Sequence, residues 1–232
     1  MTDVHDLDPV SLSAAALRAA RAGAGEAEFR ALAALSPRQL AAGLAADDTR
    51  LAFWINVYNA AIHQALRQDP GLYRRRTRFF AKSGVTVASR RLSFNAIEHG
   101  LLRRSMFGYS LGYLANPIPG RFERRFRLAR RDPRVHFALN CGASSCPPIA
   151  EYDADAINEQ LDLATKAYLE AECEYDRASN TLSVPRLFLW FRGDFGGAHG
   201  GALGFLVRHG VLEEGARPRL KFRKWDWAMT LG

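Results

Sequence analysis

Hydrophobic residues recur at steps of three or four along residues 49–67. Leu51, Trp54, Ile55, Tyr58, Ile62 and Leu66 follow this spacing. Such spacing is typical of a helix with one apolar face that packs against the core. Asn59 borders this face, and a buried amide must find hydrogen-bond partners. We therefore expect Asn59 to be either a structural bridge or a residue of a functional site.

The same pattern analysis predicts the other elements of the chain. Helical periodicity covers residues 11–22, 25–34, 36–45, 93–104, 153–173 and 201–209. Ser36 and Pro37 form an N-cap and first-turn pair, and residues 121–131 are a short helix or an arm. Alternation over residues 84–92 predicts a hairpin, and strands are predicted at residues 181–185, 187–191 and 220–227.

These elements occur without an internal repeat, a linker or a low-complexity segment. We therefore expect one α+β domain over residues 49–232, rich in helix, with a small central antiparallel or mixed sheet. Papain-like and transglutaminase-like architectures are candidates for this class. Residues 1–48 are expected to be a helical extension that packs on the domain.

Residues 134–149 combine a short apolar run with two cysteines. Residues 135–140 are predicted to be a buried strand, which would place His136 and Asn140 on one face and Val135 on the other. A loop of small residues from Cys141 to Cys146 follows and ends at two prolines. Either the thiols are ordinary buried groups, or a thiol beside free backbone amides is a nucleophile with an oxyanion site.

Composition narrows the class of protein. The chain has 232 residues, 48% of them hydrophobic, and a net charge of +8. The charge comes mostly from arginine clusters, but the aromatic residues are not interleaved with them as a stacking platform, so we do not expect a nucleic-acid partner. No apolar run has the roughly 18 residues of a membrane span, and the start of the chain does not resemble a secretory signal. We expect a cytoplasmic protein.

The three cysteines do not indicate a disulfide framework or a metal site. The number is odd, and a chain of this size does not need covalent cross-links. The spacing C-x4-C lacks a second pair of cysteines or histidines, and Cys173 lies in a predicted helix. We therefore expect no metal and no cofactor.

Five stretches resemble one protein family, in the order that the family has. They are FWINVYNAAI at 53–62, LSFNAIEHGLLR at 92–103, DPRVHFALNCGASSCPPI at 132–149, LFLWF followed by DF at 187–195, and WDW at 225–227. The chain resembles the family catalogued as domain of unknown function 547. The resemblance implies an α+β fold and a thiol hydrolase-like constellation of Cys141, His136 and Glu98. Cys146 is a less telling match, because the family also accepts serine there.

Geometry limits this constellation. His136 and Cys141 are five residues apart, which is roughly 16 Å along an extended strand and too far for proton transfer. Either the chain bends after Ala138, or His99 is the base and Glu98 pairs with His136. Glu98 and His99 themselves should not pair, since they lie about 100° apart around an α-helix.

The leading hypothesis is a cysteine-dependent hydrolase or acyl transferase acting on an unknown small-molecule or peptide substrate. Cys141 is the nucleophile, with a pKa below the free value of roughly 8.5, and Cys173 is an ordinary thiol. His136 is the base, Glu98 orients it within hydrogen-bond reach, and Asn59 or Asn140 donates a hydrogen bond. The alternative is a non-catalytic binding domain in which the same groups form a buried network, with no cavity above Cys141.

Overall fold

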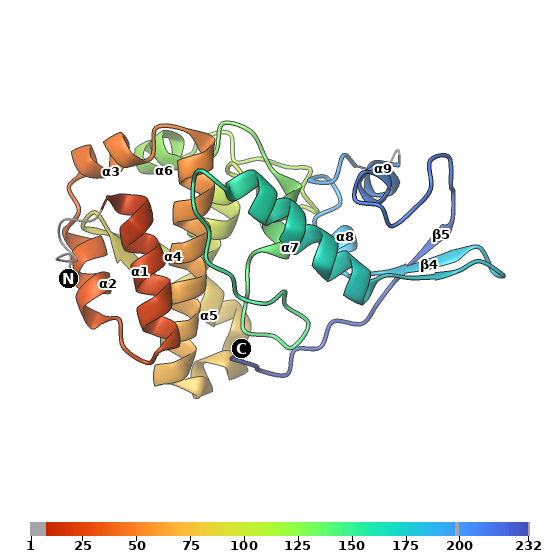
Figure 1. The fold of residues 1–232 in the computed structure, drawn as a ribbon. Coiled ribbons are helices and arrows are strands. Elements are labelled where there is room, and N and C mark those ends of the chain that lie inside the picture. The colour runs from red at the N-terminus through yellow and green to blue at the C-terminus, as the bar shows by residue number, and fades with distance from the viewer. Residues whose placement is uncertain (1–7, 198–199, 232) are drawn as a thin grey trace.

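The computed structural model describes residues 8–197 and 200–231, so the first seven residues of the predicted extension lie outside it. It shows the predicted α+β class (Figure 1). The helices are α1 (Pro9–Arg21), α2 (Glu26–Ala34), α3 (Pro37–Gly43), α4 (Asp47–Gln68), η2 (Pro70–Arg75), α5 (Arg76–Lys82), η3 (Ala96–Leu102), α6 (Arg121–Phe126), η4 (Pro133–Phe137), α7 (Ile157–Glu172), α8 (Leu187–Trp190) and α9 (Gly201–Arg208). The strands are β1 (Gly84–Val87), β2 (Arg90–Ser93), β3 (Glu174–Asp176), β4 (Thr181–Val184) and β5 (Arg219–Phe222).

Helix α4 forms the centre of the larger hydrophobic core. Every residue from Leu51 to His63 is buried, so the helix is enclosed on all sides and not on one face as its periodicity predicted. Helices α1, η3 and α7 and strand β1 pack around it. A helix enclosed in this way must satisfy its polar side chains internally, and Trp54 Nε1 donates to the carbonyl oxygen of Phe126 at 3.1 Å.

Helix α3 begins where the sequence predicts, whereas α1 begins at Pro9, before the predicted start at Ser11. Asp8 caps α1, and Ser36 forms a capping box with Gln39 at the start of α3. Leu12 and Leu17 of α1 belong to the same core as α4. The β1–β2 hairpin is tied to α2 because Ala88 N donates to Leu32 O at 2.9 Å. These helices are therefore packed directly on the domain.

A second hydrophobic core lies beside the first, on the right of Figure 1. It contains α7, α8, α9 and a three-stranded sheet of order β3–β4–β5, in which β3 pairs antiparallel with β4 and β4 pairs parallel with β5. Phe137 is completely buried within it and contacts the rings of Phe188 and Phe205. From this core, the C-terminal part of the chain runs to the cysteine loop.

Two predicted strands are wrong. Residues 135–140 do not form a strand, because Asp132 caps the backbone N–H of Arg134 and Pro133 begins the short 3-10 helix η4. Residues 187–191 form α8, because Pro185 ends β4 and its carbonyl accepts a bond from Phe188 N at 3.2 Å. In both segments a short apolar run fits a buried helical turn as well as a strand. Predicted strand 220–227 is shorter and ends at Phe222.

Among the described residues, none of the helices combines the length and the apolar character that a bilayer-spanning segment requires.

Candidate functional site

A cavity of about 910 Å³ opens between the two cores. Its walls come from α4, α5, η3, the loop that follows η3, the cysteine loop, α8 and the C-terminal segment. The cavity brings together most of the residues that the sequence singles out. Its polar and nucleophilic lining includes Tyr58, Glu98, His99, His136, Cys141 and Cys146.

Two thiols lie side by side on this wall. The Sγ atoms of Cys141 and Cys146 are 2.7 Å apart, and the backbone N–H of Cys141 donates to Sγ of Cys146 at 3.1 Å. Both cysteines are free thiols. Sγ of Cys146 therefore accepts a hydrogen bond from the amide of Cys141, and either thiol can donate in the contact between the two sulfurs.

These contacts separate the acidities of the two thiols. The hydrogen bond to Cys146, together with burial, raises the pKa of Cys141 well above its ordinary value. Burial also disfavours ionisation of Cys146, but hydrogen bonds from the thiol and amide of Cys141 and from the amide of Ala143 outweigh it and lower the Cys146 pKa. This order of acidity is the reverse of the expected one, in which Cys141 had the lowered pKa. Burial raises the pKa of Cys173 to about 12.

Two asparagines hold the cysteine loop in place. Asn59 donates to the carbonyl oxygen of Ala138 at 2.9 Å and accepts from the backbone N–H of Asn140 at 2.9 Å. The Asn140 side chain donates to Pro147 O and accepts from Gly142 N, both at 2.8 Å. Asn59 is thus the structural bridge that its position on the helix allowed. The side-chain amides of Asn59 and Asn140 are thus both bonded to backbone groups of the protein.

The C-terminal segment pairs with the outer side of the cysteine loop. Ser144 N donates to Ala228 O at 2.8 Å, and Thr230 N donates to Gly142 O at 3.0 Å. Gly142 has a φ of +85°, and a Cβ there would lie 2.5 Å from Cδ1 of Leu66. Glycine is therefore required by both the backbone and the packing.

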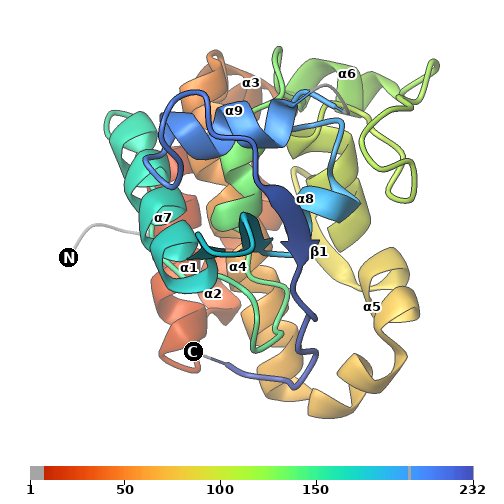
Figure 2. The same cartoon turned by 90° about the vertical axis from the view of Figure 1, so that its right-hand side faces the viewer.

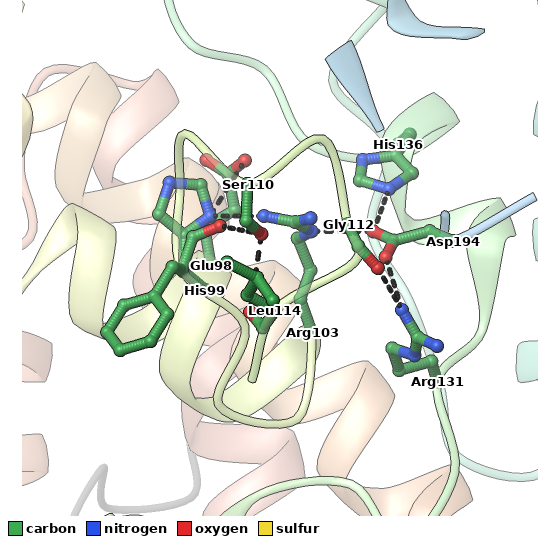
Figure 3. Close-up of polar contacts among 10 residues, drawn as sticks. Glu98, His99, Arg103, Ser110, Gly112, Leu114, Arg131, His136 and Asp194 are labelled. Atoms are coloured by element: carbon green, nitrogen blue, oxygen red, sulfur yellow. Dashed lines mark hydrogen bonds and ion pairs between the residues drawn. The ribbon is translucent and has the colours of Figure 1, made fainter. Parts of the chain in front are cut away.

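His136 pairs with Asp194 and not with Glu98, which corrects the predicted partner. Its Nε2 lies 2.9 Å from Oδ2 of Asp194, and both side chains are 2% exposed (Figure 3). The imidazole stacks on the ring of Phe191 with a centroid distance of 3.9 Å. Burial lowers the pKa of His136 more than the Asp194 contact raises it, so the neutral ring donates from Nε2 and retains Nδ1 as an acceptor.

Asp194 is held in its ionised form by arginine as well as by His136. Arg103, which is 1% exposed, donates from Nε to Oδ2 at 2.6 Å, and Arg131 donates to Oδ1 at 2.8 Å. Burial opposes ionisation, but the bonds from His136 and Arg103 keep the pKa of Asp194 well below its usual range. Pairing of this kind is what permits a buried carboxylate.

Glu98 and His99 extend this polar network beyond Arg103 (Figure 3). Tyr58 donates to Oε2 of Glu98 at 3.1 Å, and Arg103 contacts Nδ1 of His99 at 3.0 Å. Burial lowers the pKa of His99, so its neutral Nδ1 accepts from Arg103. Oε1 of Glu98 lies 3.5 Å from Nδ1 of His99, so these neighbours do approach each other, contrary to expectation, on a segment that forms a π-helix.

The structure brings the predicted residues to one cavity without a direct cysteine–histidine pair. In the described residues, no hydrogen bond joins His136 or His99 to either cysteine. The sequence did not identify Asp194 and Arg103 as site residues. It indicated Cys146 less strongly than Cys141. The signal for Asp194 was a single acidic residue after an apolar, aromatic run at residues 187–191.

A metal site is not evident in this part of the structure. Among the described residues, no three His, Cys, Asp or Glu side chains are grouped so that they could hold a metal ion.

Comparisons with known proteins give one result. Neither the curated proteins nor the solved structures contain a match to this chain. A family model described as "Protein of unknown function, DUF547" matches residues 42–169, which is more than half of the chain and includes α4, η3 and both cavity cysteines. The chain therefore belongs to the DUF547 family.

Proposed function

We propose that this protein is a cysteine-dependent hydrolase or acyl transferase whose nucleophile belongs to the Cys141–Cys146 pair. The observation that carries the proposal is the position of Sγ of Cys146, which accepts hydrogen bonds from the thiol and the amide of Cys141 and lines a large cavity. A thiolate, and not a thiol, attacks carbonyl carbon. The arrangement supports Cys146 as the attacking residue and Cys141 as the group that stabilises it.

In the proposed reaction, the Cys146 thiolate adds to the carbonyl carbon of an ester or amide, and a carbon–sulfur bond forms. The bond to the alcohol or amine then breaks, and the leaving group takes a proton from solvent water. Water or a second acceptor releases the acyl group and regenerates the thiolate. The amide of Ala143, which points toward both sulfurs, is the nearest backbone donor for developing negative charge.

His136 is the proposed base for the water or acceptor. Asp194 accepts a hydrogen bond from Nε2–H, and the contact with Phe191 fixes the plane of the ring, so Nδ1 is the basic nitrogen of this cavity residue. The roles resemble those of the histidine and carboxylate in other acyl-transfer enzymes, where the carboxylate selects the tautomer. Glu98 serves as a hydrogen-bond acceptor for Tyr58 in this arrangement.

The cavity favours a substrate with an apolar or aromatic portion. Trp190, Trp225 and Trp227 line it, with ring centroids 5.3 to 6.0 Å apart. Indole rings provide a large apolar surface at low entropic cost. The alternative of a non-catalytic binding domain predicted that no cavity lies above Cys141, and the cavity therefore favours the enzyme.

The proposal is tested by trapping an acyl-enzyme. Reduced protein is incubated with p-nitrophenyl acetate and digested, and acetylated peptides are quantified by mass spectrometry. We expect a thioester on Cys146 that hydroxylamine removes, none on Cys173, and slower release in His136→Gln. Acetylation of Cys141 instead would return the nucleophile to the residue that the sequence favours. Equal labelling of all three cysteines would contradict the proposal.

A further inference from the structure

The loop between η3 and α6 carries an unusual set of exposed apolar side chains. Six of the eight large hydrophobic residues that are exposed in the described part of the chain lie within residues 107–118. They are Phe107, Tyr109, Leu111, Tyr113, Leu114 and Ile118, with exposed fractions from 42% to 89%. Contiguous exposed apolar surface of this kind usually marks an interaction site.

Hydrogen bonds hold the loop backbone in a fixed shape. The apolar side chains are therefore exposed on an ordered segment. Phe107 N donates to Leu114 O at 2.9 Å, and Asn116 N donates to Ser105 O at 2.6 Å. Gly193 N donates to Leu111 O at 2.7 Å, and Arg131 donates to Gly112 O at 3.0 Å. The loop projects from the body beside α6 as the yellow-green segment at the upper right of Figure 2.

Arginines flank this apolar loop in the sequence. Residues 101–131 contain eight arginines and a single acidic residue, Glu123, so they hold nearly all of the chain's net charge of +8. Six of these arginines are exposed: Arg104, Arg121, Arg124, Arg125, Arg130 and Arg131. Of these six, Arg131 alone is in an ion pair among the described residues.

A second basic segment also borders the cavity. Residues Arg74, Arg75 and Arg78 of η2 and α5 are exposed, and Arg76 and Phe80 line the same cavity as Phe107 and Tyr109. Two separate segments of the chain therefore bring basic and apolar groups to the cavity.

We propose that residues 106–118 and the flanking arginines dock this protein on an anionic lipid membrane surface. Tyrosine, phenylalanine and leucine side chains enter the boundary between headgroups and acyl chains, while arginines pair with lipid phosphates. Their charge is complementary to such a surface. The docking does not depend on the thiol chemistry.

The shape and chemistry of the loop favour lipid over other anionic partners. A projecting loop fits a deformable lipid surface without a complementary hollow. Half of the six exposed apolar side chains, Leu111, Leu114 and Ile118, are aliphatic: they can enter acyl chains but offer no ring for a nucleic-acid base to stack on. Since Phe107, Tyr109 and Leu111 of the loop line the cavity, docking would also bring the cavity close to the membrane.

Vesicle sedimentation tests the proposal with two sets of variants of the full chain. The vesicles contain phosphatidylcholine alone or phosphatidylcholine with phosphatidylglycerol, at 0.05 M and 0.15 M salt. The apolar variant carries Tyr109→Ser, Leu114→Ser and Ile118→Ser, and its control is Leu163→Ser, an exposed leucine of α7. The charge variant carries Arg121→Gln and Arg124→Gln, and its control carries Arg217→Gln and Arg219→Gln, which lowers the net charge equally.

We expect the wild type to sediment with the anionic vesicles and not with the neutral ones. The charge variant should bind about 30-fold more weakly, because each arginine contributes about 1 kcal/mol near an anionic surface. The apolar variant should bind the anionic vesicles at least tenfold more weakly than the wild type, and both controls should bind as the wild type does. Thermal unfolding of the variants should be unchanged, since the replaced side chains are exposed.

Three results would overturn the proposal. One is a lack of sedimentation with anionic vesicles at the lower salt concentration. Another is an equal loss for the charge variant and its matched control, which would assign binding to net charge and not to this face. The third is self-association, or binding of an RNA oligonucleotide, that the apolar variant abolishes while vesicle binding is absent from the wild type.

Discussion

Nε2 of His136 lies 2.9 Å from Oδ2 of Asp194, and the same oxygen accepts a bond from Nε of Arg103 at 2.6 Å. One buried carboxylate oxygen therefore joins η4, η3 and the segment after α8, which are far apart in the sequence. The contact fixes the tautomer of His136 and neutralises a buried guanidinium. Asp194 therefore stabilises the fold as well as orienting His136, the proposed base.

Replacement of Asp194 by Asn should destabilise the protein strongly. Arg103 is buried and would lose its counter-ion, and breaking a buried pair by removing one partner costs about 3–5 kcal/mol. Urea unfolding measures the loss. Arg131→Gln is the matched control: Arg131 contacts the same carboxylate, but its side chain is 36% exposed, so about 1 kcal/mol or less is expected. Equal losses for the two variants would contradict this assignment.

The stability of the protein should fall as the pH is lowered from 7 toward 5. Burial lowers the folded-state pKa values of His99 and His136 below the unfolded value of about 6.5. The unfolded chain then binds more protons in this range, so the stability present above pH 6.5 is lost as pH falls through the folded pKa values. Each histidine contributes at most about 1.4 kcal/mol per pH unit.

The variant His136→Gln isolates one of these contributions. It should be less stable than the wild type at pH 7.5, but its unfolding free energy should decline less steeply with acidification. Asp194 acts in a separate range: its lowered pKa adds stability that is present above about pH 3.9 and is lost at lower pH. A wild-type protein equally stable at pH 7.5 and pH 5 would be inconsistent with neutral, buried imidazoles.

The sequence predicted the helices well because their signals are local. Apolar spacing identified α4, and Ser36 marked the start of α3. The resemblance pointed to the cavity residues Cys141, His136 and Glu98, which the structure does bring to one wall.

Other features depend on tertiary contacts that no local pattern contains. Residues 135–140 alternate like a strand, yet the Asp132-Pro133 start and the burial of Phe137 in the second core favour a 3-10 turn. Spacing in the sequence does not show whether Glu98 or Asp194 pairs with His136, since both are far from it along the chain. Likewise, the order of acidity of the two thiols depends on which sulfur accepts, and only the folded loop determines that.

Asn59→Ala should both destabilise the protein and disturb the thiols. The change leaves the Asn140 N–H and the Ala138 carbonyl without their partner, which costs about 2–4 kcal/mol. Asn56→Ala is a close control on the same helix, because Asn56 makes two equivalent bonds to the backbone of Tyr152, away from the cysteines. Both variants should lose similar stability in urea, but only Asn59→Ala should change the alkylation rate of Cys146.

The acidity of Cys146 should depend on the thiol of Cys141, and two substitutions separate that effect from simple loss of bulk. Cys141→Ala removes the Sγ donor while keeping the backbone N–H bond, whereas Cys141→Ser retains a hydroxyl donor. A hydrogen bond to a charged group contributes about 1.5–3 kcal/mol, so Cys141→Ala should slow iodoacetamide alkylation of Cys146 at pH 7 by about tenfold or more. Cys141→Ser should slow it much less.

The measurement follows each cysteine by mass spectrometry under reducing conditions, from pH 6 to pH 9. Cys173 is the internal reference, because burial raises its pKa to about 12 and it should react slowly in every variant. In the wild type, Cys146 should react first. If Cys146 reacts at the same rate in the Ala and Ser variants, the thiol of Cys141 does not stabilise the thiolate, and the backbone amides of Cys141 and Ala143 would have to account for its acidity alone.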